Sequence, residues 1–228
     1  MSKPWTKTRK RAISSLITLG FLVVVLLVMN VLIQLGLVNA GVVDMLKFIG
    51  INIIAAHGLN ILTGNCGLVS LGHAGFMMVG GYAMAILTQS AGLPFILALP
   101  ISALVAGVVG IIFGLPSLRI KGFYLIMATV AAYFILHWLV LQFRSLTGGT
   151  EGMPVPPADL FGFSIRGKET YFYVVLVLAI IATLVAKNIL RTRAGRAFIA
   201  IRDNDLAAEV MGVNLFSYKL QAFFVGCV

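Results

Sequence analysis

The chain has 228 residues, of which 60% are hydrophobic and only 11% are charged, and its formal net charge is +10. Soluble domains use roughly 45–50% apolar and about 25% charged residues. The composition therefore excludes an ordinary soluble domain and predicts an all-α, polytopic membrane protein. The 17 Lys and Arg residues lie in short clusters beside apolar runs and not on one soluble face, so the positive charge does not indicate nucleic-acid binding.

A basic tail and a long apolar run begin the chain. Residues 1–12 carry five Lys or Arg residues, and the apolar run extends from Ile13 to Leu35. A secretory signal peptide has the same order, but its apolar region is typically only about 7–15 residues long. The sequence therefore predicts a retained transmembrane span. Cleavage near Val38-Asn39-Ala40 is the alternative.

Further apolar runs approach the ~20 residues that a helix needs to cross the bilayer core. The predicted spans after the first are 45–63, 68–88, 95–115, 123–143 and 171–186. A seventh begins near Phe216 and reaches Val228 after about a dozen residues, too few to span. We therefore expect six spans and the start of a seventh, in a chain truncated at its C-terminus.

Glycines interrupt the apolar pattern between the second and third predicted spans. The junction from His57 to Phe76 contains five of them, at positions 58, 64, 67, 72 and 75. Transporters break helices where freed backbone groups line a cavity. A turn near Gly64 to Gly67 fits the charge pattern, but no Lys or Arg anchors it, so a broken or re-entrant helix is the alternative. The candidate pathway residues here are Asn60, Gly67, Ser70, Gly72 and His73.

Histidines and cysteines give no sign of a metal site. The three histidines, His57, His73 and His137, lack helical ligand spacing. Ionisable residues inside a membrane are functional candidates, but neutral histidines that form hydrogen bonds between helices are the simpler interpretation. Cys66 and Cys227 show neither metal nor disulfide spacing, so we expect small core residues.

Small residues recur at spacing four in the fourth predicted span. Ala103 and Gly107 form one such row and Ala106, Gly110 and Gly114 form another, and small residues on these helix faces let a neighbouring backbone approach closely. The loop 144–170 then contains Gly148, Gly149, Glu151 and Gly152. Such a sequence favours tight turns. It either connects two spans or forms an outer gate or a contact for a binding protein.

Charge placement predicts the orientation, because loops rich in Lys and Arg remain cytoplasmic. With the basic tail inside, alternation places Arg119, Lys121 and the segment 187–215 inside and the loop 144–170 outside. The predicted organisation is a cytoplasmic tail 1–12, a transmembrane bundle 13–186, a cytoplasmic coupling loop 187–215 and the start of a further span 216–228.

Four motifs carry a family resemblance. They are GLNILTGNCGLVSLGHAGF from Gly58, GGYAMAIL from Gly80, TGGTEGMPVP from Thr147 and AGRAFIAIRDNDLAAEVMGVN from Ala194. In this order they resemble the successive signatures of Liv-type permeases, the permease subunits of branched-chain amino acid ABC transporters. The resemblance implies a subunit of the bacterial inner membrane that pairs with a second permease. It also implies two cytoplasmic ABC ATPases, which bind the ATP, and a periplasmic substrate-binding protein.

The last motif resembles the cytoplasmic loop of ABC permeases, which has Glu-Ala-Ala, three residues and then Gly. Ala207, Ala208 and Gly212 match this pattern, and Leu206 replaces the Glu. Asp203 is predicted to cap a short helix that ends at Gly212. The candidate residues for coupling to an ATPase are Gly195, Arg196, Arg202, Asp203, Asn204, Ala207, Ala208, Glu209 and Gly212. A solvated loop with an ordinary surface helix is the alternative, since basic residues beside a span are expected from topology alone.

Catalytic chemistry is not indicated. Residues 162–168 match the spacing of a phosphate-binding loop, but Glu169 occupies the Ser/Thr position that would meet magnesium. We therefore expect a transport subunit with no cofactor or metal of its own, working by alternating access. The competing function is a secondary transporter or channel without an ATPase. An ion-coupled carrier normally places Asp or Glu within a span, and the predicted spans contain none.

Overall fold

The computed structural model describes residue 20 and residues 40–117, 122–155, 159–160, 163–164 and 167–228. The predicted tail, Arg119, Lys121 and all of the predicted first span except Gly20 lie outside the described residues, as do residues 162, 165 and 166 of the segment 162–168. The chain divides into two compact units. One contains residues 1–51 and 167–181, and the other contains residues 52–166 and 182–228.

The first unit contains the beginning of α2 (Ala40–Leu59) and the beginning of α7 (Lys168–Arg191). The two helices approach closely, because a Cβ atom on Gly50 would lie 2.6 Å from Val175 Cγ1. Lys47 Nζ lies 2.5 Å from Asp44 Oδ1 and 5.7 Å from the centre of the Tyr171 ring. Helix α2 begins five residues before the predicted span, so Asp44 lies within the candidate span Gly41–Asn65. The expectation that no span carries an acidic residue is therefore wrong. The Lys47 ion pair offsets the Asp44 charge.

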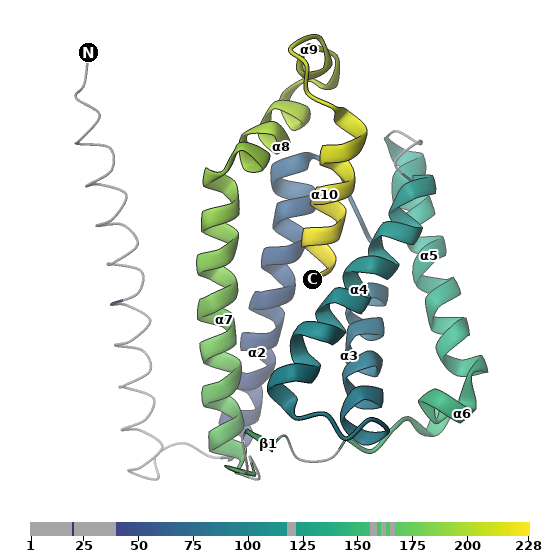
Figure 1. The fold of residues 1–228 in the computed structure, drawn as a ribbon, viewed down its shortest axis with the longest axis vertical. Helices are drawn as coiled ribbons and strands as arrows, with labels where there is room; N and C mark the ends of the chain where they lie inside the picture. Colours follow the sequence, from purple (N-terminus) through teal and green to yellow (C-terminus); the bar gives the residue numbers. More distant parts are fainter. Residues whose placement is uncertain (1–19, 21–39, 118–121, 156–158, 161–162, 165–166) are drawn as a thin grey trace. The chain divides into compact units, whose positions relative to one another are not determined.

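The second unit is built from helices (Figure 1). In chain order its remaining elements are η1 (Asn60–Asn65), α3 (His73–Gln89), α4 (Phe95–Ser117), α5 (Phe123–Gln142), α6 (Arg144–Thr147), η2 (Gly149–Glu151), β1 (Asp159–Leu160), β2 (Phe163–Ser164), α8 (Arg193–Asp203), α9 (Asp205–Val210) and α10 (Leu215–Cys227). The two strands are antiparallel and pair Asp159 with Ser164. The predicted α-helical class is confirmed.

Four of the described helical segments are long and apolar enough to cross a membrane, namely Gly41–Asn65, Phe95–Pro116, Phe123–Gln142 and Thr170–Arg191. They correspond to predicted spans 45–63, 95–115, 123–143 and 171–186. The last continues to Arg191 because Lys187 and Asn188 do not stop a helix. Helix α3 corresponds to predicted span 68–88, but its 17 residues are fewer than the ~20 that a helix needs to cross the bilayer core.

The predicted start of the third span is wrong. Helix α3 begins at His73, five residues after Leu68. Gly67 has a left-handed backbone with φ of +73°, which stops the preceding helix. Residues 67–72 then have no helical structure. The apolar composition of this stretch hides the break, because Leu68, Val69 and Leu71 suit a membrane whether helical or not.

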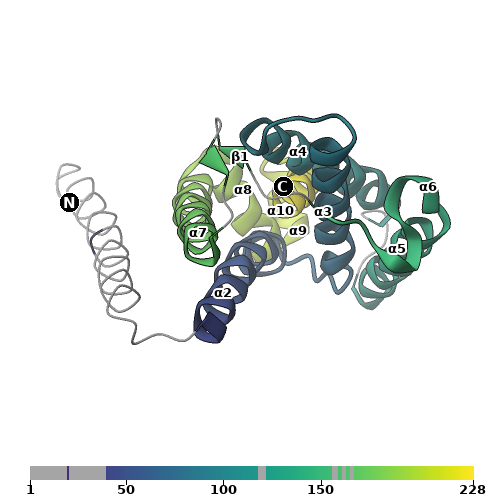
Figure 2. The same ribbon diagram turned by 90° about the horizontal axis from the view of Figure 1, so that it is seen from below.

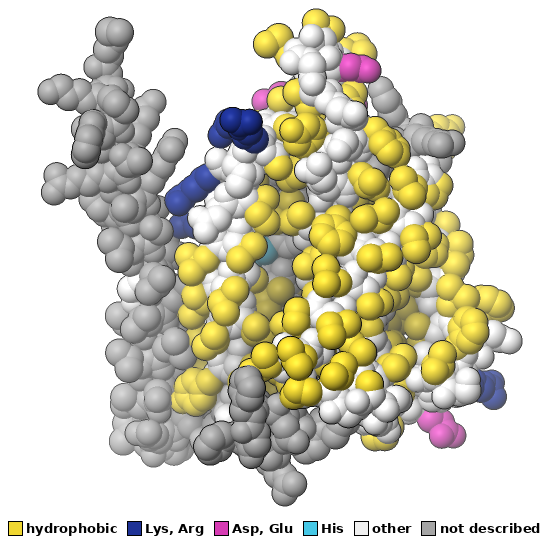
Figure 3. All heavy atoms as spheres, in the orientation of Figure 1, with side chains coloured by type: hydrophobic (Ala, Val, Ile, Leu, Met, Phe, Trp, Pro, Cys, Tyr) yellow, Lys and Arg dark blue, Asp and Glu magenta, His cyan; other side chains and the backbone are white. Residues whose placement is uncertain are grey.

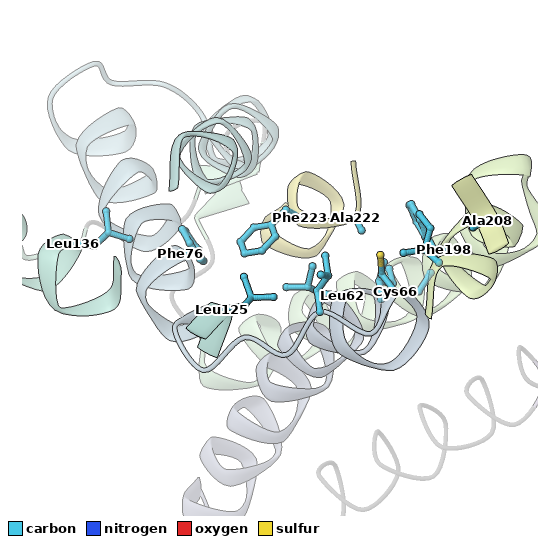
Figure 4. Close-up of a cluster of buried hydrophobic side chains, with 13 residues drawn as sticks. Leu62, Cys66, Phe76, Leu125, Leu136, Phe198, Ala208, Ala222 and Phe223 are labelled. Carbon is cyan, nitrogen blue, oxygen red and sulfur yellow. The ribbon is translucent and has the colours of Figure 1, made fainter. Parts of the chain in front are cut away.

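Helices α3, α4 and α10 form the core of the second unit, with α5 beside α3 (Figures 1 and 2). The glycines of α4 face α10, as the spacing predicts. A Cβ atom on Gly107 would lie 2.5 Å from the Phe224 ring, and one on Gly110 would lie 2.6 Å from Cys227 Sγ. The buried cluster extends through Phe76 and Phe223, whose rings meet edge to face at 6.1 Å (Figure 4).

Apolar side chains also cover outward surfaces of this unit. Figure 3 shows them over α4 and α5, whereas charged side chains lie near α8 and α9 and, at the opposite end of the unit, near α6. A surface this apolar is normal for lipid contact and unusual for contact with water. Helices α8 and α9 lie at one end of the unit, and α6 lies at the other (Figure 1).

Candidate coupling segment and helix break

The predicted coupling loop consists of two helices with capped ends. Thr192 caps α8, since its Oγ1 accepts a hydrogen bond from the Gly195 amide at 3.3 Å. Gly195 itself is buried, and a Cβ atom there would lie 2.5 Å from both Ile189 O and Leu190 Cα. Only glycine fits where α8 folds back against the end of α7. This packing requirement explains Gly195 without any contact to a partner.

The cap of α9 lies one residue later than predicted. Asn204 Oδ1 accepts a hydrogen bond from the Ala207 amide at 3.1 Å, whereas Asp203 is the last residue of α8. Asp203 instead accepts hydrogen bonds from Arg202, at 3.3 Å from Nε and 3.2 Å from Nη2. Asp203, Asn204 and Asp205 are all good capping residues, so local chemistry does not choose among them. The prediction that Asp203 caps this helix is wrong.

Gly212 ends α9 as predicted. Its φ is +82°, its amide donates to Glu209 O at 2.9 Å, and the Val213 amide donates to Ala208 O at 3.0 Å. This pair of hydrogen bonds is the Schellman arrangement, in which a left-handed glycine satisfies the last carbonyl groups of a helix. Both ends of α9 are therefore fixed, although the helix has only six residues.

The tip of α9 exposes apolar side chains. Leu206 is 70% exposed, Val210 is 87% exposed and Met211 is 83% exposed. Leu206 and Val210 share a helix face at spacing four, whereas Ala208 is buried. Ala207, Glu209, Gly212 and Arg196 are also exposed. Large exposed apolar side chains on a rigid, capped element indicate a contact surface.

A partly buried ion pair connects α9 to α10. Lys219 Nζ lies 2.7 Å from Asp205 Oδ2, and Lys219 is only 9% exposed. Cys66, 2% exposed, lies near both charges. Burial raises the pKa of the Cys66 thiol to about 12, while the Lys219 ammonium lowers it and the Asp205 carboxylate raises it. This thiol is therefore protonated at neutral pH.

Arg202 joins the coupling segment to the helix break. Its Nη1 donates to Gly64 O at 2.9 Å, although the two residues are 138 positions apart in sequence. A Cβ atom on Gly67 would lie 3.1 Å from Arg202 Cγ, so the backbone turn lies directly against this side chain. The structure thus brings Arg202 from one predicted group and Gly67 from the other into contact.

The helix break itself runs through the interior. Along residues 68–72 the burial alternates, with Leu68, Ser70 and Gly72 buried and Val69 and Leu71 exposed, as in an extended strand. A Cβ atom on Gly72 would collide with the carbonyl oxygen of Thr129, and Thr129 Oγ1 accepts a hydrogen bond from the Leu71 amide at 3.2 Å. The break is therefore pinned to α5.

Two buried polar atoms at the break have no hydrogen-bond partner among the described residues, namely Ser70 Oγ and His73 Nδ1. His73 also forms a hydrogen bond with the backbone of Gly226. Because Nδ1 is unpartnered, we assign this bond to Nε2 as the donor, an assignment that leaves Nδ1 as an acceptor. Asn60 is not part of this group, since it is exposed and its Oδ1 lies against Gly64.

Comparison with known proteins decides the family. The family model described as branched-chain amino acid transport system, permease component, matches residues 41–228. The chain belongs to this family. The match contains both the coupling segment and the helix break. With the four apolar helices, it makes the chain an integral membrane protein.

The curated relatives carry the same description. The chain is 32% identical over 213 residues to the high-affinity branched-chain amino acid transport system permease protein LivM of Escherichia coli strain K12 and, equally, to that of Salmonella typhimurium strain LT2. Each match covers 83% of this chain and 50% of the relative. A probable branched-chain amino acid transport permease protein LivM of Methanocaldococcus jannaschii is 26% identical over 134 residues, covering 58% of this chain and 38% of the relative. This permease chain thus spans about half the length of the first two relatives. No solved structure matches it.

The predicted outer-gate residues of this permease lie together at the opposite end of the second unit from α9. Gly148, Gly149 and Gly152 all have positive φ, and Gly148 lies against Gly152 O. Thr147 Oγ1 donates to Val140 O at 2.6 Å and holds the turn on α5. Gly149 is buried, whereas Glu151 is exposed. The loop has the tight turns that its sequence predicts.

The histidines of the permease make contacts between and within helices. His57 Nε2 lies 3.0 Å from Thr183 Oγ1, and His73 bonds Gly226, so the predicted hydrogen bonding between helices is confirmed for these two. His137 stacks on Tyr133 with ring centres 6.0 Å apart. Within the described part of the chain, no three His, Cys, Asp or Glu side chains form a group that could hold a metal ion.

Proposed function

We propose that this chain is a membrane-spanning permease subunit of an ABC importer for branched-chain amino acids. It would form part of the translocation pathway and receive motion from partner ATPases. Family membership supports the transport class, and the names of the LivM relatives support the substrate. The observation that supports the coupling role is the exposed apolar surface of α9, a helix that is capped at both ends.

Helix α9 is the proposed docking element for a cytoplasmic ABC ATPase. Its exposed face is apolar, and the Lys219 to Asp205 ion pair connects it to α10. A displacement of α9 would therefore be transmitted to α10, because the capped helix is held to α10 by a partly buried ion pair. Leu206, at the position where other ABC permeases have Glu, adds apolar area to this face.

The partner set follows from the same proposal. An ABC importer of this type would contain two cytoplasmic ATPases, which bind the ATP, a second homologous permease and a periplasmic substrate-binding protein. The chain itself would contribute no cofactor. We place it in the bacterial inner membrane with a cytoplasmic N-terminus. The proposed organisation remains a tail 1–12, a bundle 13–186, a coupling loop 187–215 and the start of a further span 216–228.

The helix break is the proposed pathway element. Ser70 Oγ can donate or accept a hydrogen bond, and His73 Nδ1 can accept one. Buried polar groups in native proteins are normally satisfied, so these two atoms suit a polar solute that passes the break. Thr129 lies six residues into α5, about 9 Å from the start of that helix, and this distance supports a position of the break inside the proposed bundle. Gly148, Gly149, Glu151 and Gly152 are the proposed outer gate or binding-protein contact.

Copurification tests the proposal. We expect the wild-type permease, expressed with its ATPase partners, to retain them in detergent. The substitution Val210→Asp places a charge on the exposed tip, where Val210 is 87% exposed, and should reduce ATPase retention about ten-fold or more, as loss of an apolar contact does. The matched variant Val210→Ala adds no charge and should retain most of the ATPase. Equal retention by wild type and Val210→Asp would remove α9 from the interface.

A second measurement separates the competing function. Purified permease without any ATPase, reconstituted in vesicles with a proton gradient, should not take up leucine. Uptake under these conditions would establish a secondary transporter and overturn the ABC assignment. The family does not favour that alternative.

A further inference from the structure

Arg202 makes two separate attachments to the helix break. The first is the hydrogen bond from Nη1 to Gly64 O at 2.9 Å. The second is packing, since the three atoms nearest to a Cβ atom built on Gly67 are all from Arg202, at 3.1–3.5 Å. Together they enclose the turn from both sides of Cys66.

The end of η1 has the chemistry to receive a guanidinium. The last carbonyl groups of a helix have no partner within that helix, and they carry a partial negative charge. Gly64 O belongs to the last turn before the break. A positive donor at a helix C-terminus is therefore favourable in both hydrogen bonding and charge. Gly67, with its φ of +73°, lets the backbone lie flat against Arg202, where a side chain would be strained and crowded.

Arg202 also belongs to the segment that holds α9. It lies in the last turn of α8, its guanidinium reaches Asp203, and Asn204 is the cap of α9. Helix α9 therefore has two connections to the membrane helices. One passes through Asp205 and Lys219 to α10, and the other passes through Arg202 to the break.

We infer that Arg202 is a positioning residue that couples α9 to the helix break. Resting on the proposed role of α9, this inference adds a second route for movement. Displacement of α9 moves Arg202, which carries the Gly64 to Gly67 turn and, three residues further, Ser70. The far end of the break is pinned to Thr129, so movement of the turn changes the conformation of the extended segment 68–72 and the position of the α3 N-terminus.

Cys66 is a natural reporter for this connection. It lies between the two attachment points and is almost fully buried. With Cys227→Ala removing the only other cysteine in the chain, the rate of labelling by a membrane-impermeant maleimide measures opening of the turn. Arg202→Ala should raise this rate about ten-fold, because a charge-assisted hydrogen bond is lost. Arg202→Lys, which keeps the charge without the planar fork, should be intermediate.

Arg193→Ala is the matched control. Arg193 is an exposed arginine on the same helix, outside the predicted coupling set, and its replacement should leave the labelling rate unchanged. Gel filtration and thermal unfolding of each variant confirm that the chain is folded. A folded Arg202→Ala variant that labels at the wild-type rate would overturn the inference.

A second arm separates positioning from simple support. In the assembled transporter, a non-hydrolysable ATP analogue should change the Cys66 labelling rate in the wild type. Arg202→Ala should lose this nucleotide response when the rate is measured on the complexes that retain the ATPase. A response equal to that of the wild type would show that Arg202 does not transmit movement. If the wild-type chain retains no ATPase, the proposed function fails, and the labelling of the isolated chain still tests the contact.

Discussion

Helix α9 and the break before α3 depart from normal burial in opposite ways. At α9, Leu206, Val210 and Met211 are exposed although they are apolar, whereas at the break Ser70 Oγ and His73 Nδ1 are buried without a hydrogen-bond partner among the described residues. Exposed apolar area favours contact with a protein partner, and unsatisfied buried polar groups favour binding of a polar solute or water. In the proposed function, the contrast separates a docking surface for an ATPase from a segment that meets the solute, and the hydrogen bond from Arg202 to Gly64 O lies between them.

The contrast requires that the break be rigidly shaped, and Gly72 offers the most severe test. A Cβ atom on Gly72 would collide with Thr129 O, which is backbone and cannot rotate away. Gly72→Ala should therefore destabilise the second unit by about 3 kcal/mol, the upper end of overpacking costs, and should abolish uptake. Thermal unfolding in detergent and leucine uptake in cells are the measurements.

The control for Gly72 is available in the same helix region. Gly81 in α3 has nothing within 4 Å of an added Cβ atom. Gly81→Ala should leave stability unchanged or raise it by up to about 1 kcal/mol, the usual helix preference for Ala. If both substitutions cost the same, the break is not tightly packed against Thr129.

The connection from α9 to α10 should be the next most sensitive. Lys219→Met leaves the Asp205 carboxylate partly buried without its partner, which should cost about 2–3 kcal/mol, less than a fully buried pair because Asp205 keeps some solvent contact. Adding Asp205→Asn to this variant should recover part of the loss. Thermal unfolding of the wild type, both single variants and the double variant gives the coupling energy. Additive effects would show that the ion pair contributes little and that α9 is held mainly by packing.

These elements differ in how far the sequence predicts them. Hydropathy identifies the four long apolar helices, and the glycine spacing of α4 identifies the face that meets α10, because both depend on local pattern. The start of α3 cannot be found this way. It depends on contact with Thr129, which is more than fifty residues distant, and an extended apolar stretch has the composition of a helical one.

The site shows the same division. Gly212 was predictable as the end of α9, since a left-handed glycine has a clear sequence signal. Choosing Asn204 over Asp203 as the cap was not, because both side chains suit that position. The contact between Arg202 and Gly64 joins segments 138 residues apart and has no local signal. A basic residue near an unsatisfied helix end is only a weak indication before the fold is known.

At neutral pH the smallest expected effect concerns the thiol beside the α9 anchor, because this effect appears only above pH 9. The Cys66 pKa is about 12 in the folded chain and 9.0 for an ordinary thiol. Because the folded-state value is the higher one, the contribution of this group to stability is fully present below pH 9 and is lost as the pH rises toward 12. The wild type should therefore lose thermal stability between these values more steeply than Cys66→Ala, with no difference in slope at pH 6–8. Parallel slopes up to pH 11 would show that water reaches the thiol, and the turn held by Arg202 would then be open even before α9 moves.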